Sequence, residues 1–136
     1  PMEYGKAELL YAEGDICLLA VGSMVETSVK VRGLLREKGL KCSVVNARFV
    51  KPIDEFAISW AASNHRVIVT MEENVLSGGF GQSVRNYMDT LDENCKLINI
   101  ALPDDYVEHG NVNILKKELG IDAEGICRTI LEARPF

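Results

Sequence analysis

The residues of this sequence that could do chemistry gather in polar segments, each of which directly follows an apolar run. The segments that concern us cover 48–54, 72–83 and 103–110. Carboxylate and imidazole groups transfer protons or bind metal ions, and arginine and lysine bind anions. If the apolar runs are parallel strands, ligands are expected at their carboxyl ends, where these segments begin. The charged candidates there are Arg48, Lys51, Glu72, Glu73, Asp104 and His109.

The adjacent carboxylates Glu72 and Glu73 come at the end of an apolar run. Neighbouring side chains on a strand point to opposite faces, so these two cannot both converge on one substrate. We favour a structural role over general acid–base catalysis, with one of the two partly buried against Arg48 or Lys51. A polar loop explains the acidic residues and His109 at 104–109 more simply than metal ligation does. We therefore assign no catalytic, cofactor-binding or metal-ligating residue.

The G-G-F-G stretch at 78–81 opens a helical pattern. Free N–H groups and the helix dipole at such a start can hold an anion. The stretch fails the dinucleotide-binding fingerprint, because Val84 stands where the third glycine belongs, and no Gly-Lys-Ser/Thr follows as in a P-loop. Two interpretations stay open for Gly78, Gly79 and Gly81. They either allow helix and strand to pack closely, which we favour, or they form an anion site.

The elements that must position these segments follow from the periodicity. Four apolar, β-rich runs at 16–21, 41–46, 66–72 and 96–102 alternate with helical patterns, which is typical of βαβ units and a parallel sheet. The weaker run at 6–12 reaches the first of these through a short turn, which predicts an antiparallel hairpin. We predict one α/β domain over 1–136, with about five strands in a three-layer mixed sheet, four parallel and one antiparallel at the N-terminus, and helices on both faces.

Helix boundaries are also marked in the sequence. Ser23 followed by Glu26 predicts a capping box, and Gly39 predicts the end of that helix. Asp54 is a good N-cap for a helix over 55–63. Asn111 and Asp122 are expected to cap two closing helices. The apolar residues of 80–91 fall on one helical face, so that segment is predicted to pack against the sheet.

Composition excludes several classes of function. The 136 residues carry a net charge of −5, which argues against nucleic acid as a ligand. No apolar run approaches the 18 or so residues of a membrane span, and no signal-peptide pattern is present. The four cysteines form no C-x-x-C motif, so free thiols, a cytoplasmic location and no zinc site are expected.

The polar segments are similar to those of the 1-deoxy-D-xylulose-5-phosphate synthase family. R-F-V-K-P-I-D at 48–54 resembles its R-F-V-K-P-x-D segment. T-M-E-E-N at 70–74, followed by G-G-F-G at 78–81, resembles its T-x-E-E-N and G-G-x-G. L-P-D at 102–104, H-G at 109–110 and L-G-I-D-A-E-G-I at 119–126 resemble its L-P-D, H-G and L-G-L-D-A-x-G-I. The resemblance covers nearly the whole chain in the right order.

This resemblance implies that the chain is the carboxy-terminal domain of a three-domain homodimeric enzyme, and that this domain is of the transketolase C-terminal-like type. That enzyme condenses pyruvate with glyceraldehyde 3-phosphate, releases carbon dioxide and uses thiamine diphosphate and Mg²⁺; its product feeds isoprenoid, thiamine and pyridoxal synthesis. The family's diphosphate–metal motif belongs to the first domain and its cofactor-activating glutamate to the second, so neither Glu72 nor Glu73 inherits these roles. The resemblance thus implies a structural and assembly domain, inactive alone, whose partners are its own polypeptide's other domains and a second identical subunit.

Two alternatives remain open. The chain could be an anion-binding regulatory module, with its ligand at the helix start near Gly79. It could also be the corresponding domain of a 2-oxo acid dehydrogenase β subunit. That family shares two of the segments: P-x-D, and E-E followed by G-G-x-G. Such a subunit would associate with an α chain and an acyltransferase core. In every case we expect the charged candidates to share one edge of the sheet, as a protein interface or as a solvated polar rim.

Overall fold

The computed structural model describes residues 6–48, 52–76, 78–102 and 119–136. Four residues that the sequence analysis singled out lie outside these ranges. They are Lys51, Asp104, His109 and the expected helix cap Asn111. No helix among the described residues is long and apolar enough to cross a membrane.

The sheet has five strands: β1 (Glu8–Tyr11), β2 (Ile16–Ala20), β3 (Cys42–Asn46), β4 (Val67–Val75) and β5 (Lys96–Leu102). Their order across the sheet is β1-β3-β2-β4-β5. The last four are mutually parallel and β1 is antiparallel, which confirms the predicted mixed sheet. A parallel sheet covered on both faces buries nearly every side chain of its strands. Runs of apolar, β-branched residues therefore form these strands.

The predicted hairpin between the first two strands is wrong. β1 pairs with β3, with Leu9 opposite Val45, and not with β2. The reason is that β2 is central: β3 and β4 occupy its two edges in parallel register, which leaves no edge for β1. The chain therefore crosses to the free edge of β3, and the Ser43 hydroxyl fixes the connection by accepting a hydrogen bond from the Glu13 N–H at 2.9 Å.

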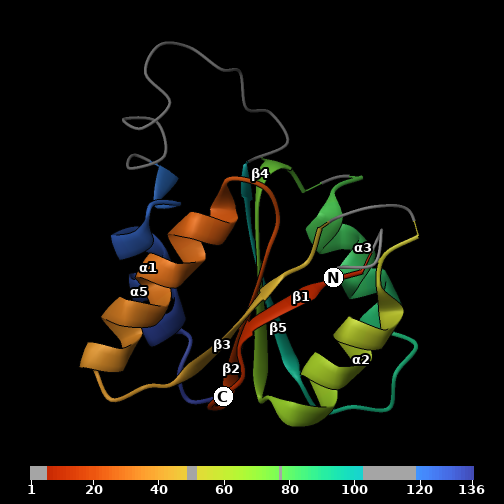
Figure 1. Cartoon of the computed structure of the whole chain (residues 1–136), viewed down its shortest axis with the longest axis horizontal. Coiled ribbons are helices and arrows are strands. Elements are labelled where there is room, and N and C mark those ends of the chain that lie inside the picture. The colour runs from red at the N-terminus through yellow and green to blue at the C-terminus, as the bar shows by residue number, and fades with distance from the viewer. Residues whose placement is uncertain (1–5, 49–51, 77, 103–118) are drawn as a thin grey trace.

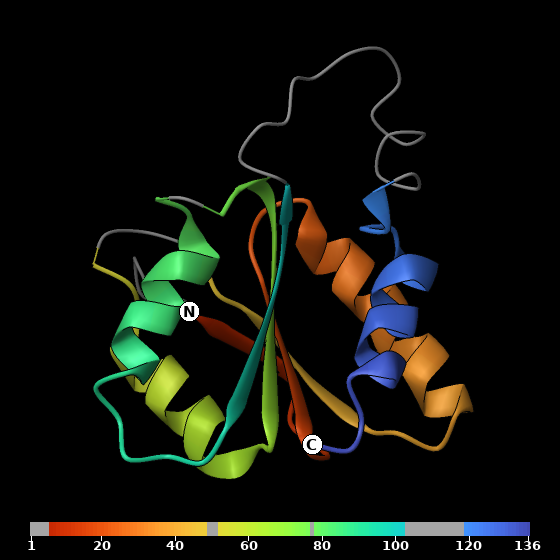
Figure 2. The same ribbon diagram turned by 180° about the vertical axis from the view of Figure 1, so that it is seen from behind.

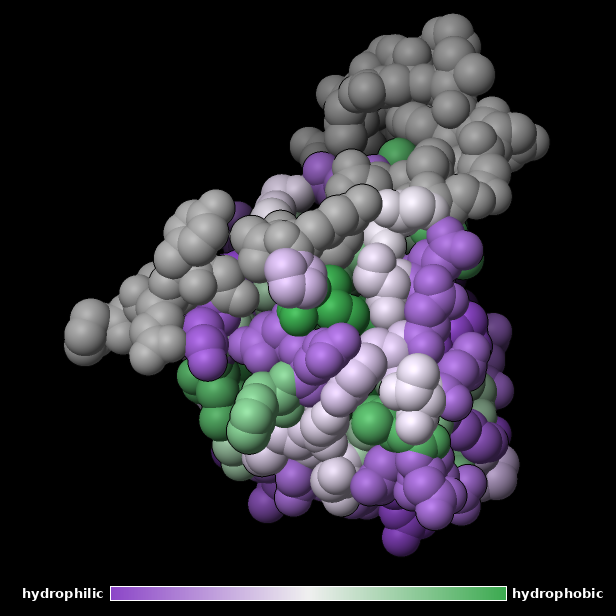
Figure 3. Space-filling model, turned by 90° about the vertical axis from the view of Figure 1, so that its right-hand side faces the viewer, coloured by the Kyte–Doolittle hydropathy of each residue, from purple (hydrophilic) through white to green (hydrophobic). Residues whose placement is uncertain are grey.

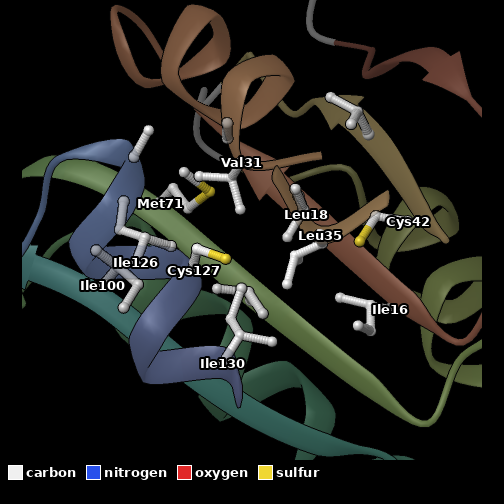
Figure 4. Packing of buried hydrophobic residues seen from close by; sticks show 14 of the residues in the cluster. Ile16, Leu18, Val31, Leu35, Cys42, Met71, Ile100, Ile126, Cys127 and Ile130 are labelled. Atoms are coloured by element: carbon white, nitrogen blue, oxygen red, sulfur yellow. The ribbon is translucent and has the colours of Figure 1, made fainter. Parts of the chain in front are cut away.

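Helices cover both faces of the sheet, as predicted (Figures 1 and 2). Helices α1 (Met24–Glu37) and α5 (Ala123–Glu132) pack together on one face. Helices α2 (Glu55–Asn64) and α3 (Phe80–Met88) pack on the other. Strand alternation separates two cores, because successive side chains of each strand enter opposite faces. Ile16, Leu18 and Met71 belong to the α1/α5 core of Figure 4, whereas Cys17 and Leu19 belong to the α2/α3 core.

The predicted helix boundaries are largely confirmed. Asp54 accepts a hydrogen bond from the Ala57 N–H at 3.1 Å, and Asp122 accepts one from the Gly125 N–H at 2.9 Å. Gly39 ends α1 with φ +81°, a left-handed conformation that favours glycine. The Ser23 capping box is wrong: Ser23 has helical φ and ψ, and its side chain makes no cap hydrogen bond.

All four cysteines are free, as predicted. Burial raises the pKa of Cys42 to about 12 and that of Cys95 to about 11. At neutral pH these thiols are therefore protonated, and a protonated thiol is a poor nucleophile and metal ligand. Both thiols belong to the packing of the sheet and its helices.

Candidate functional site

The carboxylate of Glu72 lies at the amino-terminal end of α3. Its Oε1 accepts a hydrogen bond from the Phe80 N–H at 2.9 Å, and its Oε2 accepts one from the Gly81 N–H at 2.6 Å. The Glu72 side chain is fully buried. The first amides of a helix have no partner within the helix, so this carboxylate supplies acceptors that α3 would otherwise lack. It also places a negative charge at the positive end of the helix dipole.

The local sequence explains how α3 returns to the strand that precedes it. β4 continues past Glu72 to Val75, and its register against β5 shifts between Met71 and Val75. Gly78 then turns the chain with φ +73°, a conformation open to glycine, and Gly79 is the extended residue before the helix. The Gly78 N–H donates to the side-chain Oε1 of Gln82 at 2.6 Å, which holds the turn against the first helical turn.

Burial raises the pKa of Glu72, and the two amide hydrogen bonds from Gly81 and Phe80 oppose that rise. Removing a carboxylate from water favours its protonated form, whereas N–H donors favour the charged form. Burial is the larger effect, so the net direction is upward. A raised pKa in a cleft is a signature of acid–base catalysts. Here both oxygens are occupied by backbone amides of the same chain, which indicates a structural carboxylate.

Three further polar side chains complete the site on the same face of the sheet. Thr70 lies directly opposite Asn99 in the β4–β5 pairing. With its amide nitrogen toward Thr70, Asn99 donates to the Thr70 hydroxyl at 2.6 Å, and its oxygen accepts from Nε and Nη2 of Arg85 at 3.3 and 3.2 Å. The exposed guanidinium of Arg85 on α3 is thereby tied to the edge strand.

Gly81 lies where these side chains meet. A Cβ at this position would be 2.8 Å from Oε2 of Glu72 and 2.9 Å from the Thr70 hydroxyl. No side chain fits without a shift of the buried polar groups. The close-packing interpretation of the glycines is thus supported at Gly81. An external anion at this helix start would have to displace Glu72 from the Phe80 and Gly81 amides.

One of the glutamates is expected from the sequence to lie against Arg48 or Lys51; for Glu72 the Arg48 alternative is wrong, and Lys51 lies outside the described residues. Nη2 of Arg48 pairs with Oε1 of Glu8 on β1 at 3.2 Å, and β3 and β2 lie between β1 and β4. Arg48 follows β3, which lies beside β1, whereas Glu72 belongs to β4 and both of its oxygens accept amides of α3. Arg48 adopts a left-handed conformation with φ +46°. Its backbone N–H donates a hydrogen bond to Oδ1 of Asn46 at 3.2 Å.

The other described candidates differ in how far they are exposed to solvent. Glu73 is half-buried, Gly79 is buried and Gly78 is exposed. Sequence reasoning missed Thr70, Arg85 and Asn99, although one signal was available: Asn99 is the one uncharged polar residue in the apolar run 96–102. No group of three or more histidine, cysteine, aspartate or glutamate side chains is placed to hold a metal ion in the described ranges.

The mixed five-stranded sheet with helices on both faces defines an α/β domain with the transketolase C-terminal-like fold. The family model described as "Transketolase, C-terminal domain" matches residues 5–126, and the chain belongs to that family. Its sequence is 47% identical over 132 residues to 1-deoxy-D-xylulose-5-phosphate synthase of Lachnoclostridium phytofermentans, covering 96% of this chain and 21% of that protein. The synthase of Clostridium tetani is 38% identical over 128 residues, covering 94% and 21%.

The chain thus spans about a fifth of the length of the curated relatives it matches, and the match falls on their carboxy-terminal part. Among solved structures, a split-gene transketolase described as an inactive β4 tetramer aligns with a TM-score of 0.87 at 23% identity, covering 97% of this chain and 43% of that one. A transketolase mutant from Pichia stipitis aligns with a TM-score of 0.65 at 18% identity, covering 94% and 18%. At these identities the structural matches show the fold.

Proposed function

We propose that the chain is the carboxy-terminal structural and assembly domain of a 1-deoxy-D-xylulose-5-phosphate synthase. The full-length enzyme would condense pyruvate with glyceraldehyde 3-phosphate, release carbon dioxide and form 1-deoxy-D-xylulose 5-phosphate, with thiamine diphosphate and Mg²⁺ as cofactors. The observation that carries this proposal is the 47% identity over nearly the whole chain to the carboxy-terminal part of such a synthase. The enzyme would be a cytoplasmic homodimer that supplies isoprenoid, thiamine and pyridoxal synthesis.

The described residues do not fit the cofactors themselves. Mg²⁺ in a diphosphate site is held by oxygen ligands, and the metal-ligating residue types are not grouped in threes or more in the parts of the chain that the structure describes. Glu72, the buried carboxylate at the carboxyl edge of the sheet, is bound by amides of α3. We therefore derive no catalytic step through thiamine diphosphate in this chain, and we expect the isolated chain to bind it no tighter than millimolar in calorimetry with Mg²⁺ present.

The proposed partners are the preceding domains and a second subunit, with the carboxyl edge of the sheet as the contact surface. Within the part of the chain that the structure describes, Arg48 and Glu73 are the partly accessible charged candidates. Figure 3 shows the α2/α3 face, where small apolar areas alternate with polar ones. Phe56 on α2 is 86% exposed and adds an apolar group that a partner could cover. Charged groups on such a surface set register and orientation more than they add affinity.

Three variants of a full-length synthase that carries this sequence test the assembly role. Arg48→Ala changes the proposed surface, His109→Ala tests a candidate known from the sequence alone, and Glu132→Ala on α5 is the control. We expect the first two to weaken dimer assembly, seen by light scattering, and to lower turnover of pyruvate and glyceraldehyde 3-phosphate. If both variants assemble and turn over like the parent, the carboxyl edge is a solvated rim and the proposed interface is wrong.

The second candidate function is that of a domain of a 2-oxo acid dehydrogenase β subunit. It is tested by which proteins the chain binds. Co-expression with an α chain and an acyltransferase core would give a stable complex in that case. The synthase proposal expects no such complex and expects condensation activity only in the full-length polypeptide. Activity of a polypeptide truncated before this domain, equal to that of the parent, would contradict the structural and assembly role.

A further inference from the structure

A second site lies at the opposite edge of the sheet, where the parallel strands begin. A pocket of about 350 Å³ opens there between the start of β2, the loop that follows α1 and the carboxy-terminal segment. Its polar lining comes from segments distant in sequence, namely 14–15, 39–41, 66 and 134. The charged side chains that line it are Asp15, Lys41, Arg66 and Arg134.

The charge of this pocket differs from that of the chain. Three cations and one carboxylate side chain line it, although the whole protein carries a net charge of −5. Asp15 lies 3.9 Å from Nε of Arg66, and the side chains of both are 69% exposed, which makes a weak pair. Among the described residues, Lys41 and Arg134 form no ion pair through their side chains.

The backbone that carries these cations is held in place. Gly14 packs so closely on Lys41 that a Cβ would lie 1.9 Å from the Lys41 carbonyl oxygen. The Asp15 carbonyl accepts the N–H of Arg66 at 2.8 Å, and the Arg66 carbonyl accepts the N–H of Lys96 at 2.9 Å. Nζ of Lys96 donates to the Pro135 carbonyl at 3.2 Å, which ties the segment carrying Arg134 to the sheet.

The ordinary explanation for cations at this edge is the helix dipole, because α1, α2 and α5 all end there. That explanation accounts for each cation singly, but it does not account for their convergence on one pocket. The end of α3 gives the comparison within the same chain. Its C-cap is Asp89, and Asp92 and Glu93 follow, so a helix end in this fold does not by itself require a cation.

We propose that this pocket binds a small phosphate-bearing anion through Lys41, Arg66 and Arg134. Two guanidinium groups can each present paired N–H donors to phosphate oxygens, and the ammonium of Lys41 adds a compact third charge. Leu40, Pro135 and Phe136 line the rest of the pocket, so an organic phosphate finds apolar contacts beside the charged group. The site is separate from the carboxyl edge and does not rest on the proposed enzyme function.

Titration of the chain with inorganic phosphate and with diphosphate at low ionic strength tests the proposal. We expect saturable shifts of the Gly14, Gly39 and Leu40 backbone amides in NMR spectra, with none at Phe80 or Gly81. Diphosphate, with more charge, is expected to bind at least fivefold tighter than inorganic phosphate. Acetate at equal concentration serves as the monovalent control, because a single charge gains less from three cations.

Matched substitutions separate a built site from general charge. Arg134→Gln and Arg66→Gln are each expected to weaken diphosphate binding at least fivefold. Arg128→Gln, which removes the same charge from an exposed position of α5 outside the pocket, is expected to change it less than twofold. Asp15→Asn should strengthen binding at least twofold. Equal losses for Arg128→Gln and Arg134→Gln, or unchanged binding in both pocket variants, would overturn the proposal; circular dichroism confirms that each variant is folded.

Discussion

The charged side chains at the two edges of the sheet differ in their burial and in their hydrogen-bond and ion-pair partners. At the carboxyl edge, Glu72 is buried and both of its oxygens accept backbone N–H groups of α3. At the amino edge, Arg66 is largely exposed, and Lys41 and Arg134 line a pocket without ion-pair partners among the described residues. A buried charge must be satisfied within the fold, because leaving it unpaired costs several kcal/mol. Exposed charges carry no such requirement and remain available to a ligand.

This difference changes what a substitution measures. A variant of Glu72 perturbs the docking of α3 on β4, so its effect appears first in the free energy of unfolding. A variant of Arg134 leaves the core untouched, so its effect appears in binding. Charge at a sheet edge is therefore assigned to fold or to function by its burial and its partners, and the residue type alone does not distinguish them.

The largest expected effect is that of Glu72→Ala. The substitution leaves the Phe80 and Gly81 amides without their buried acceptor, and each unsatisfied buried donor costs about 1–3 kcal/mol. We expect a loss of about 3 kcal/mol in the free energy of unfolding, measured by urea denaturation. The exposed Glu132→Ala on α5 is the control and should stay within about 0.5 kcal/mol. A loss below about 1 kcal/mol for Glu72→Ala would contradict a structural carboxylate.

Two glycine substitutions are expected to have opposite signs. Gly81→Ala forces a Cβ to within 2.8 Å of Oε2 of Glu72 and should destabilise the chain by about 1–3 kcal/mol. Gly33→Ala lies inside α1 with open space around its Cβ and should stabilise it by about 0.5–1 kcal/mol. Thermal unfolding of both variants checks the pair. If Gly81→Ala proves as mild as Gly33→Ala, the polar groups around Gly81 are not tightly packed.

The pH dependence of stability tests the raised pKa of Glu72. Between the ordinary glutamate pKa and the raised value, the folded chain binds more protons at this group than the unfolded chain does. The contribution of Glu72 to stability therefore falls as pH rises through that window. We expect the free energy of unfolding of the parent, minus that of Glu72→Gln, to decrease across it.

Urea denaturation at a series of pH values from 4 to 8 measures that difference. Glu132→Gln controls for the loss of one negative charge at an exposed position. A difference that increases with pH would mean that the two amide hydrogen bonds outweigh burial, and the assigned direction would be wrong.

The last comparison concerns two helix starts at the carboxyl edge, one of which is expected to show almost no effect. Asp54 accepts the Ala57 N–H at 3.1 Å and, through its other oxygen, the Ala7 N–H at 2.9 Å. Asp54→Ala should therefore cost about 1–2 kcal/mol. Ser23 makes no cap hydrogen bond, so Ser23→Ala should cost less than about 0.5 kcal/mol in the same urea experiment. Equal costs would show that Ser23 caps α1 in solution.

Much of the fold could be predicted because its signals are local. Apolar runs and capping residues gave the five strands, the α2 start at Asp54 and the α5 start at Asp122. The family motifs gave the domain type, which the match over residues 5–126 confirms. The four parallel strands followed from the alternation of strands and helices, since parallel neighbours require such crossovers. The antiparallel β1 was predicted from a hairpin with β2 that the structure does not form.

Only the tertiary structure decided which strand β1 would join and which groups Glu72 would contact. Strand pairing depends on which sheet edges are free, and β2 has none because β3 and β4 flank it. The partner of Glu72 depends on where α3 begins in space, eight residues later in the chain, after a turn at Gly78. Likewise Lys41, Arg66 and Arg134 are far apart in sequence and meet because parallel strands start at one edge, where the carboxy-terminal segment returns. Local conformation depends on residues that are neighbours in the sequence. Which distant charged residues come to lie together depends on how the elements pack.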